Sequence, residues 1–232
     1  MRWLFFLFLL CITHQLKGQK SIHSLWTTAL KEYVDEEGKV NYLHWKKDTK
    51  LLDDYISSLE ENPPANYWTK NDSLAYFINA YNAVTIKLIL DHYPLKSIRK
   101  LVTPWRFKRF KLNGKKISLN HIEHQILRKM KEPRIHFAIN CASASCPKLR
   151  NRAFYAHSME QQLEEVTKGF INDPKRNQLN QHEMVISRIF QWFGGDFGTK
   201  KERHAFIRRY AKQPIDINAK VRFLNYDWQL NE

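Results

Sequence analysis

Apolar residues recur at helical spacing through most of the chain. Intervals of three and four residues predict helices, which we place at residues 24–34, 50–59, 120–130, 158–171 and 200–210. The segment LAYFINAYNAVTIKLIL, residues 74–90, is apolar on almost every face, which is typical of a helix buried on most sides. The pattern therefore predicts a helix-rich fold with one central helix.

Shorter segments alternate between apolar and polar positions and predict strands. Asn113-Gly114 lies between two alternating runs in residues 106–117, which is a strong hairpin signal. Strands are also expected at 135–140, 184–187 and 221–224. We expect an α+β class: a single helix-rich domain over residues 20–232, with a small, mostly antiparallel sheet packed on the buried central helix.

Residues 1–19 have the pattern of a secretory signal peptide. A single arginine precedes an unbroken apolar run from Trp3 to Ile12, and a polar stretch with Gly18 follows. The run is too short to span a bilayer, although an N-terminal membrane anchor is the alternative interpretation. We therefore expect an exported protein that is periplasmic, bound to the cell envelope or secreted.

The chain is strongly basic. Its 38 Lys and Arg against 23 Asp and Glu give +15, and cleavage after Gly18 would remove Arg2 and Lys17 and leave 15 − 2 = +13. Six basic residues lie in the hairpin, where aromatic residues are interleaved with them: Arg106, Lys108, Arg109, Lys111, Lys115 and Lys116. In an exported protein this favours an anionic envelope polysaccharide or lipid surface, and we expect no nucleic-acid partner. A solvated strand face with phenylalanine packed inward explains the pattern without any partner.

Four motifs carry a family resemblance. They are FINAYNAVTIKLIL at 77–90, SLNHIEHQILR at 118–128, RIHFAINCASASCPKLR at 134–150 and RIFQWFGGDF at 188–197. Together they resemble the domain of unknown function 547 family over about residues 76–197. The resemblance implies a fold family and a candidate site but no reaction. Lys148 departs from the family's usual SCPPLR.

Cys141 is the candidate nucleophile of a cysteine-dependent hydrolase acting on a small peptide or amide substrate. A nucleophilic cysteine needs a base within hydrogen-bond reach and a third group that orients the base. His124 is the preferred base and Glu123 the orienting group, whereas His136 lies about 16 Å from Cys141 if the strand is extended. Small residues at 142–145 would let backbone N–H groups approach a developing oxyanion.

The alternative is that Cys141 and Cys146 form a disulfide in a non-catalytic binding or structural module of the cell envelope. Removal of the signal peptide takes Cys11 with it and leaves these two cysteines five positions apart. Both hypotheses remain open from the sequence.

The remaining polar residues have structural interpretations as well. Glu123 is also placed to complete a capping box with Asn120 at the start of its helix. Asn79 and Asn82 share one face of the central helix, and we expect loop backbone to satisfy their buried amides. His121 points away from the face that carries His124, so the histidines do not converge, and we expect no metal and no cofactor.

Overall fold

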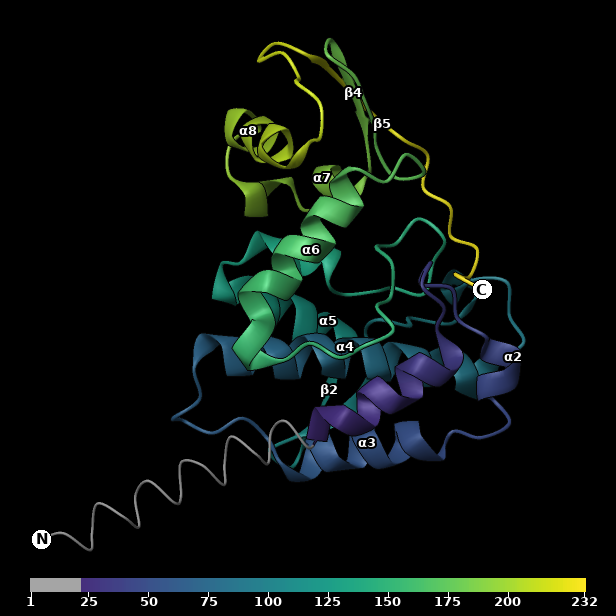
Figure 1. The fold of residues 1–232 in the computed structure, drawn as a ribbon. Coiled ribbons are helices and arrows are strands. Elements are labelled where there is room, and N and C mark those ends of the chain that lie inside the picture. The colour runs from purple at the N-terminus through teal and green to yellow at the C-terminus, as the bar shows by residue number, and fades with distance from the viewer. Residues whose placement is uncertain (1–21) are drawn as a thin grey trace, which may run out of the picture.

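The computed structural model describes residues 22–232 (Figure 1). The predicted signal peptide lies outside the described residues. After a first helix at residues 22–33, the helical elements are α2 (Tyr42–Trp45), α3 (Lys50–Glu61), α4 (Lys70–His92), η1 (Ile98–Lys100), α5 (Leu119–His121), η2 (Ile122–Leu127), η3 (Arg128–Met130), η4 (Pro133–Phe137), η5 (Ala156–Ser158), α6 (Met159–Ile171), α7 (Ile189–Trp192), η6 (Gly194–Phe197) and α8 (Lys200–Tyr210).

Within the described residues, five short strands form two sheets. They are β1 (Lys108–Leu112), β2 (Lys115–Ser118), β3 (Gln178–Leu179), β4 (Glu183–Ile186) and β5 (Lys220–Phe223). β1 and β2 form the predicted antiparallel hairpin, while β4 pairs antiparallel with β3 and parallel with β5. The α+β class is confirmed, with the strands divided between two sheets.

The predicted central helix is α4. It begins with a capping box, in which the Thr69 hydroxyl accepts from the Asp72 backbone and the Asp72 carboxylate accepts from the Thr69 backbone. α4 is long and apolar enough to cross a membrane, but 89% of its most apolar window is buried inside the fold. Figure 1 shows α3 and the first helix on one side of α4 and α6 on the other. α4 is therefore the core helix around which the chain packs.

Two hydrophobic clusters share the interior. The larger surrounds α4, and the smaller joins α6, α7, α8 and the three-stranded sheet. η4 links them because Ile135 belongs to the larger cluster and Phe137 to the smaller. His136, between these two residues, is therefore held at the junction of the two clusters.

The predicted strand at 135–140 is wrong, because residues 133–137 form a 3-10 helix. Pro133 occupies a first-turn position, and the Glu132 side chain accepts from the Arg134 backbone N–H at 3.2 Å. The alternation of apolar and polar residues predicted a strand with one solvated face. His136, on the polar side of that alternation, is instead buried like its neighbours Ile135 and Phe137. The extended distance assumed between His136 and Cys141 therefore does not apply.

Candidate functional site

Four residues proposed from the sequence line one cavity: Glu123, His124, His136 and Cys141. The cavity has a volume of about 450 Å³, and we call it the aromatic pocket. Its remaining lining residues are Tyr81, Thr103, Pro104, Trp105, Arg106, Asn120, Ile139, Cys146, Pro147, Ile189, Trp192, Phe193, Tyr226 and Trp228. Segments far apart in the sequence therefore meet at the place that the motifs indicated.

Glu123 is a buried carboxyl that faces α4. Tyr81 donates a hydrogen bond to its Oε2 at 3.1 Å. Burial raises the pKa of Glu123 to about 7, against the opposing effects of the Tyr81 hydrogen bond and the nearby Arg128. The capping box with Asn120 is wrong, because Ser118 caps this helix through its Oγ, 3.2 Å from the His121 nitrogen. Glu123 is therefore an acid that can exchange a proton near neutral pH.

His136 is held by a carboxylate that the sequence analysis did not identify. Its Nε2 lies 2.7 Å from Asp196 Oδ2. Arg128 donates two hydrogen bonds to the same carboxylate, from Nε at 2.6 Å and from Nη2 at 2.7 Å. Although burial alone would raise it, hydrogen bonds from His136 and Arg128 hold the pKa of Asp196 below its usual range. Because Asp196 is ionised, Nε2 of His136 carries the proton, and Nδ1 is left as the basic nitrogen.

His124 has a different environment from His136. Its Nδ1 lies 2.8 Å from Arg128 Nη1, which donates to it. Burial and the neighbouring Arg128 lower the pKa of His124. Glu123 bonds to Tyr81 rather than to this ring, so the predicted orientation of His124 by Glu123 is not found. His121 is exposed, and no group of three metal-ligand side chains occurs within residues 22–232.

Cys141 and Cys146 form a disulfide with an S–S distance of 2.03 Å. Cys141 therefore has no thiolate in this state, and the disulfide that belonged to the alternative hypothesis is present. Tyr226 OH lies 3.3 Å from each sulfur, and Ser143 Oγ lies 3.3 Å from Cys141 Sγ. Disulfide sulfurs carry no hydrogen, so Tyr226 OH donates weakly to Cys146 Sγ, while Ser143 Oγ donates to Tyr226 OH at 3.2 Å.

Three of the four backbone N–H groups in residues 142–145 already donate hydrogen bonds within the fold. Ala142 N donates to Asn140 Oδ1 at 2.7 Å. Ala144 N and Ser145 N donate to the carbonyls of Gln229 and Asp227 at 2.8 and 3.2 Å. Carbonyl groups of the C-terminal segment thus accept hydrogen bonds from two backbone N–H groups that we expected to face a developing oxyanion.

The asparagines of α4 support this corner, as the sequence analysis expected. Asn82 donates to the Ala138 carbonyl at 3.0 Å and accepts from Asn140 N at 2.8 Å. Asn79 donates to the Phe154 carbonyl at 2.8 Å and accepts from Phe154 N at 2.9 Å. The central helix therefore fixes the backbone that leads into the disulfide.

Aromatic rings form much of the pocket wall. The Trp192 ring lies 4.7 Å from the Tyr226 ring and 5.8 Å from the Trp228 ring, between centroids. Trp105 contacts Trp228 at 5.9 Å. Trp192 is 45% exposed, so part of this apolar wall faces solvent. The RIFQWFGGDF motif, which contains Trp192 and Asp196, was the only signal in the sequence for these missed residues.

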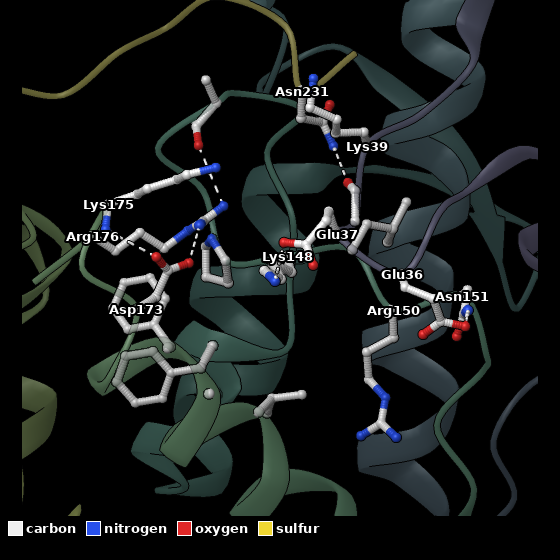
Figure 2. Close-up of a pocket in the computed structure, with 18 of the residues that line it drawn as sticks. Glu36, Glu37, Lys39, Lys148, Arg150, Asn151, Asp173, Lys175, Arg176 and Asn231 are labelled. Carbon is white, nitrogen blue, oxygen red and sulfur yellow. Dashed lines mark hydrogen bonds and ion pairs between the residues drawn. The ribbon is translucent and has the colours of Figure 1, made fainter. Parts of the chain in front are cut away.

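A second and larger cavity, of about 730 Å³, shares Pro147 with the aromatic pocket but is otherwise lined by different residues (Figure 2). We call it the charged groove. Several of its charged groups pair with one another: Lys148 Nζ lies 2.7 Å from Glu37, Arg150 lies 3.0 Å from Glu165, and Arg176 pairs with Asp173. None of the proposed site residues lines it. The aromatic pocket is therefore the stronger candidate site, despite its smaller volume.

The comparisons with known proteins agree with the motif analysis. The family model described as "Protein of unknown function, DUF547" matches residues 65–171. The predicted resemblance to the domain of unknown function 547 family is thereby confirmed over these residues, and the matched segment includes Glu123, His124, His136 and Cys141. Comparisons with curated proteins and with solved structures give no match.

Proposed function

We propose that this chain is an exported, non-catalytic binding module of the cell envelope, and that its aromatic pocket holds a small organic molecule. The observation that carries the proposal is the pocket itself. Its volume is about 450 Å³, six Phe, Tyr and Trp residues line it, and a few buried polar groups converge on it. This volume and this lining are typical of small-molecule sites.

The lining sets the chemistry of the ligand. Trp105, Trp192 and Trp228 offer apolar surface for a ring or another flat apolar body. The protonated Glu123 can donate a hydrogen bond, and the His136 ring is an acceptor fixed by Asp196. We therefore expect a ligand with one apolar face and a polar end that both accepts and donates.

The bridged cysteines support binding rather than catalysis. The disulfide removes the nucleophile, and two of the loop amides, those of Ala144 and Ser145, already donate to the C-terminal segment. In this function the bridge and its Tyr226 hydrogen bonds are part of a rigid wall. A preformed wall reduces the entropy cost of binding.

A ligand screen tests the proposal. A panel of small peptides, aromatic acids and oligosaccharides is added to the exported chain, and thermal stabilisation and tryptophan fluorescence are followed. We expect a compound that stabilises the wild type to bind Trp192→Ala and His136→Ala at least tenfold more weakly. Tyr67→Ala is the matched control, because Tyr67 is 66% exposed and does not line the pocket. Equal binding by the pocket variants and the control would refute the proposal.

One observation favours a second candidate function, the cysteine-dependent hydrolase. Cys141 and His136 line the same pocket, and Asp196 orients His136 as the third group of a catalytic set. If a dithiol reductant opens the bridge, Cys141 becomes a thiol in the pocket that a basic imidazole also lines. In this candidate the base is His136, and Glu123 retains no orienting role.

Cys146→Ser separates the two functions because it leaves Cys141 as a free thiol without any reductant. The hydrolase predicts that this variant cleaves an activated ester or anilide, and that His136→Ala in the same background loses at least 100-fold of the rate. Cys141→Ser, which frees Cys146 instead, is the matched control and should be inactive. A Cys146→Ser protein with no more activity than this control leaves the binding module as the function.

A further inference from the structure

Residues 96–116 form the most one-sidedly charged segment of the fold. It holds nine basic residues and no acidic one: Lys96, Arg99, Lys100, Arg106, Lys108, Arg109, Lys111, Lys115 and Lys116. The segment comprises η1, the loop that follows it and most of the β1–β2 hairpin. It therefore concentrates about a quarter of the 38 basic residues of the chain in 21 positions.

None of these nine basic side chains forms an ion pair with any residue in the described part of the chain. Two of them cover aromatic rings instead: Arg99 lies 5.3 Å from the Trp228 ring centre and Arg109 lies 4.7 Å from that of Phe107. Elsewhere some lysines and arginines pair with carboxylates, as Lys148 and Arg150 do. The positive charge of residues 96–116 is therefore left for an external anion.

The same segment exposes apolar side chains. Val102 is 89% exposed and Phe107 is 56% exposed. A tight turn brings their backbones close together, since the Thr103 carbonyl accepts from Arg106 N at 3.0 Å and from Phe107 N at 3.2 Å. Isolated exposed apolar residues are common, but here two of them flank one turn within an uncompensated basic segment. This combination is typical of a surface that inserts into a membrane interface.

Helix α8 provides an internal comparison. It is also basic, with exposed Lys200, Lys201 and Arg209. However, its Ile207 and Tyr210 are buried in the smaller hydrophobic cluster. α8 therefore carries exposed charge without the exposed apolar residues of the 96–116 segment.

We propose that the 96–116 segment docks on an anionic phospholipid surface, with Val102 and Phe107 entering the headgroup region and the basic side chains contacting lipid phosphates. Lipid fits the segment better than a polysaccharide or a nucleic acid, because neither of those offers an apolar layer to Val102. The loop also supplies Trp105 and Arg106 to the aromatic pocket, so docking would place the pocket beside the membrane. The proposal does not depend on the pocket's function.

The test is sedimentation of the exported chain with vesicles of phosphatidylcholine containing 30 mol% phosphatidylglycerol, against vesicles of phosphatidylcholine alone. We expect binding only to the anionic vesicles. Lys100→Gln, Lys108→Gln and Lys116→Gln combined should weaken it by about fivefold per residue. Val102→Ser with Phe107→Ser, which leaves the charge unchanged, should weaken it by about tenfold.

The matched control replaces Lys200, Lys201 and Arg209 of α8 by glutamine, which removes the same charge. This control should bind anionic vesicles within about threefold of the wild type. Circular dichroism of every variant checks the fold. The proposal is overturned if the α8 control loses as much binding as the variant with Lys100, Lys108 and Lys116 replaced, because net charge alone would then explain the binding. It is also overturned if the Val102 variant binds normally, or if the wild type binds a soluble anionic polysaccharide but no vesicle.

Discussion

The two cavities of this molecule differ in what their polar groups do. In the charged groove, Lys148 pairs with Glu37 and Arg176 with Asp173 (Figure 2), and Arg150 pairs with Glu165, so several ionic groups neutralise one another. In the aromatic pocket, Glu123 has a hydroxyl partner but no cation within hydrogen-bond distance among the described residues, and burial has moved its pKa to about 7. Acids in the larger cavity are thus paired with cations, whereas the buried acid of the smaller cavity can still exchange a proton.

The difference shows that the volume of a cavity in this fold does not indicate how reactive its polar groups are. A carboxyl with a strongly perturbed pKa in a cleft is a candidate functional group, because burying an unpaired acid reduces stability and needs another reason to persist. Exposed ion pairs contribute little to stability or specificity. The comparison therefore predicts large effects from changes in the aromatic pocket and small effects in the groove.

The largest expected effect is on the pH dependence of stability in Glu123→Gln. The pKa of Glu123 rises from 4.5 to about 7 in the folded protein, so folding favours the protonated acid. The contribution of the protonated Glu123 to the free energy of unfolding is fully present below pH 4.5 and is lost as pH rises through about 7. The loss amounts to about 3 kcal/mol. Glutamine cannot ionise, so the free energy of unfolding of the variant relative to wild type should increase by about 3 kcal/mol between pH 4.5 and pH 8. Urea titrations at both pH values measure this difference.

Glu37→Gln is the control for that experiment, because the Glu37 side chain is 66% exposed in the charged groove. Its stability relative to wild type should change by less than about 0.5 kcal/mol between the two pH values. Should Glu123→Gln behave like Glu37→Gln, the contrast between the two cavities would disappear.

The next effect is the loss of the disulfide. Replacing both Cys141 and Cys146 by serine should lower the free energy of unfolding by about 2 kcal/mol, as expected for closing so short a loop. A dithiol reductant should destabilise the wild type by a similar amount and leave the double variant unchanged. Denatured, unreduced wild-type protein should show no free thiol from either cysteine, and two free thiols would contradict the bridged wall.

A somewhat smaller effect is expected from Asp196→Asn. The variant keeps an acceptor for His136 but removes the charge that Arg128 and His136 share. Since the Arg128 and Asp196 side chains are 30% and 22% exposed, solvent screens the interaction, and we expect a loss of about 1–2 kcal/mol. The pKa of His136, already lowered by burial, should fall further without Asp196, which NMR titration of the ring can detect. An unchanged pKa of His136 would show that Asp196 does not orient the ring.

Much of the fold was predictable because local signals agree with the tertiary structure. The apolar run at 74–90 became α4, the Asn113-Gly114 signal became the β1–β2 hairpin, and α8 spans the predicted residues. The convergence of Glu123 and Cys141 on one site was also predictable, since both lie in motifs of one family.

Other parts of the site depend on contacts that no local pattern encodes. Asp196 reaches His136 across 60 positions, and Tyr226 reaches Cys141 across 85. η4 looked like a strand because alternation assumes that one face is solvated, whereas His136 is buried as deeply as Phe137. The sequence therefore indicated residues that share one cavity, but it did not indicate that Asp196 and Tyr226 contact them.

The smallest expected effect is that of Lys148→Gln, at the position where the chain departs from the usual family motif. Lys148 and Glu37 lie 2.7 Å apart, but their side chains are 42% and 66% exposed. An ion pair so exposed contributes less than about 0.5 kcal/mol, and salt screens what remains. The free energy of unfolding of the variant should therefore differ from that of the wild type by less than about 0.5 kcal/mol, and by less still in 0.5 M NaCl. Any ligand of the aromatic pocket should bind the variant as tightly as it binds the wild type. A loss above about 1 kcal/mol, or weaker ligand binding, would show that the charged groove is coupled to the site and that the two cavities are not independent.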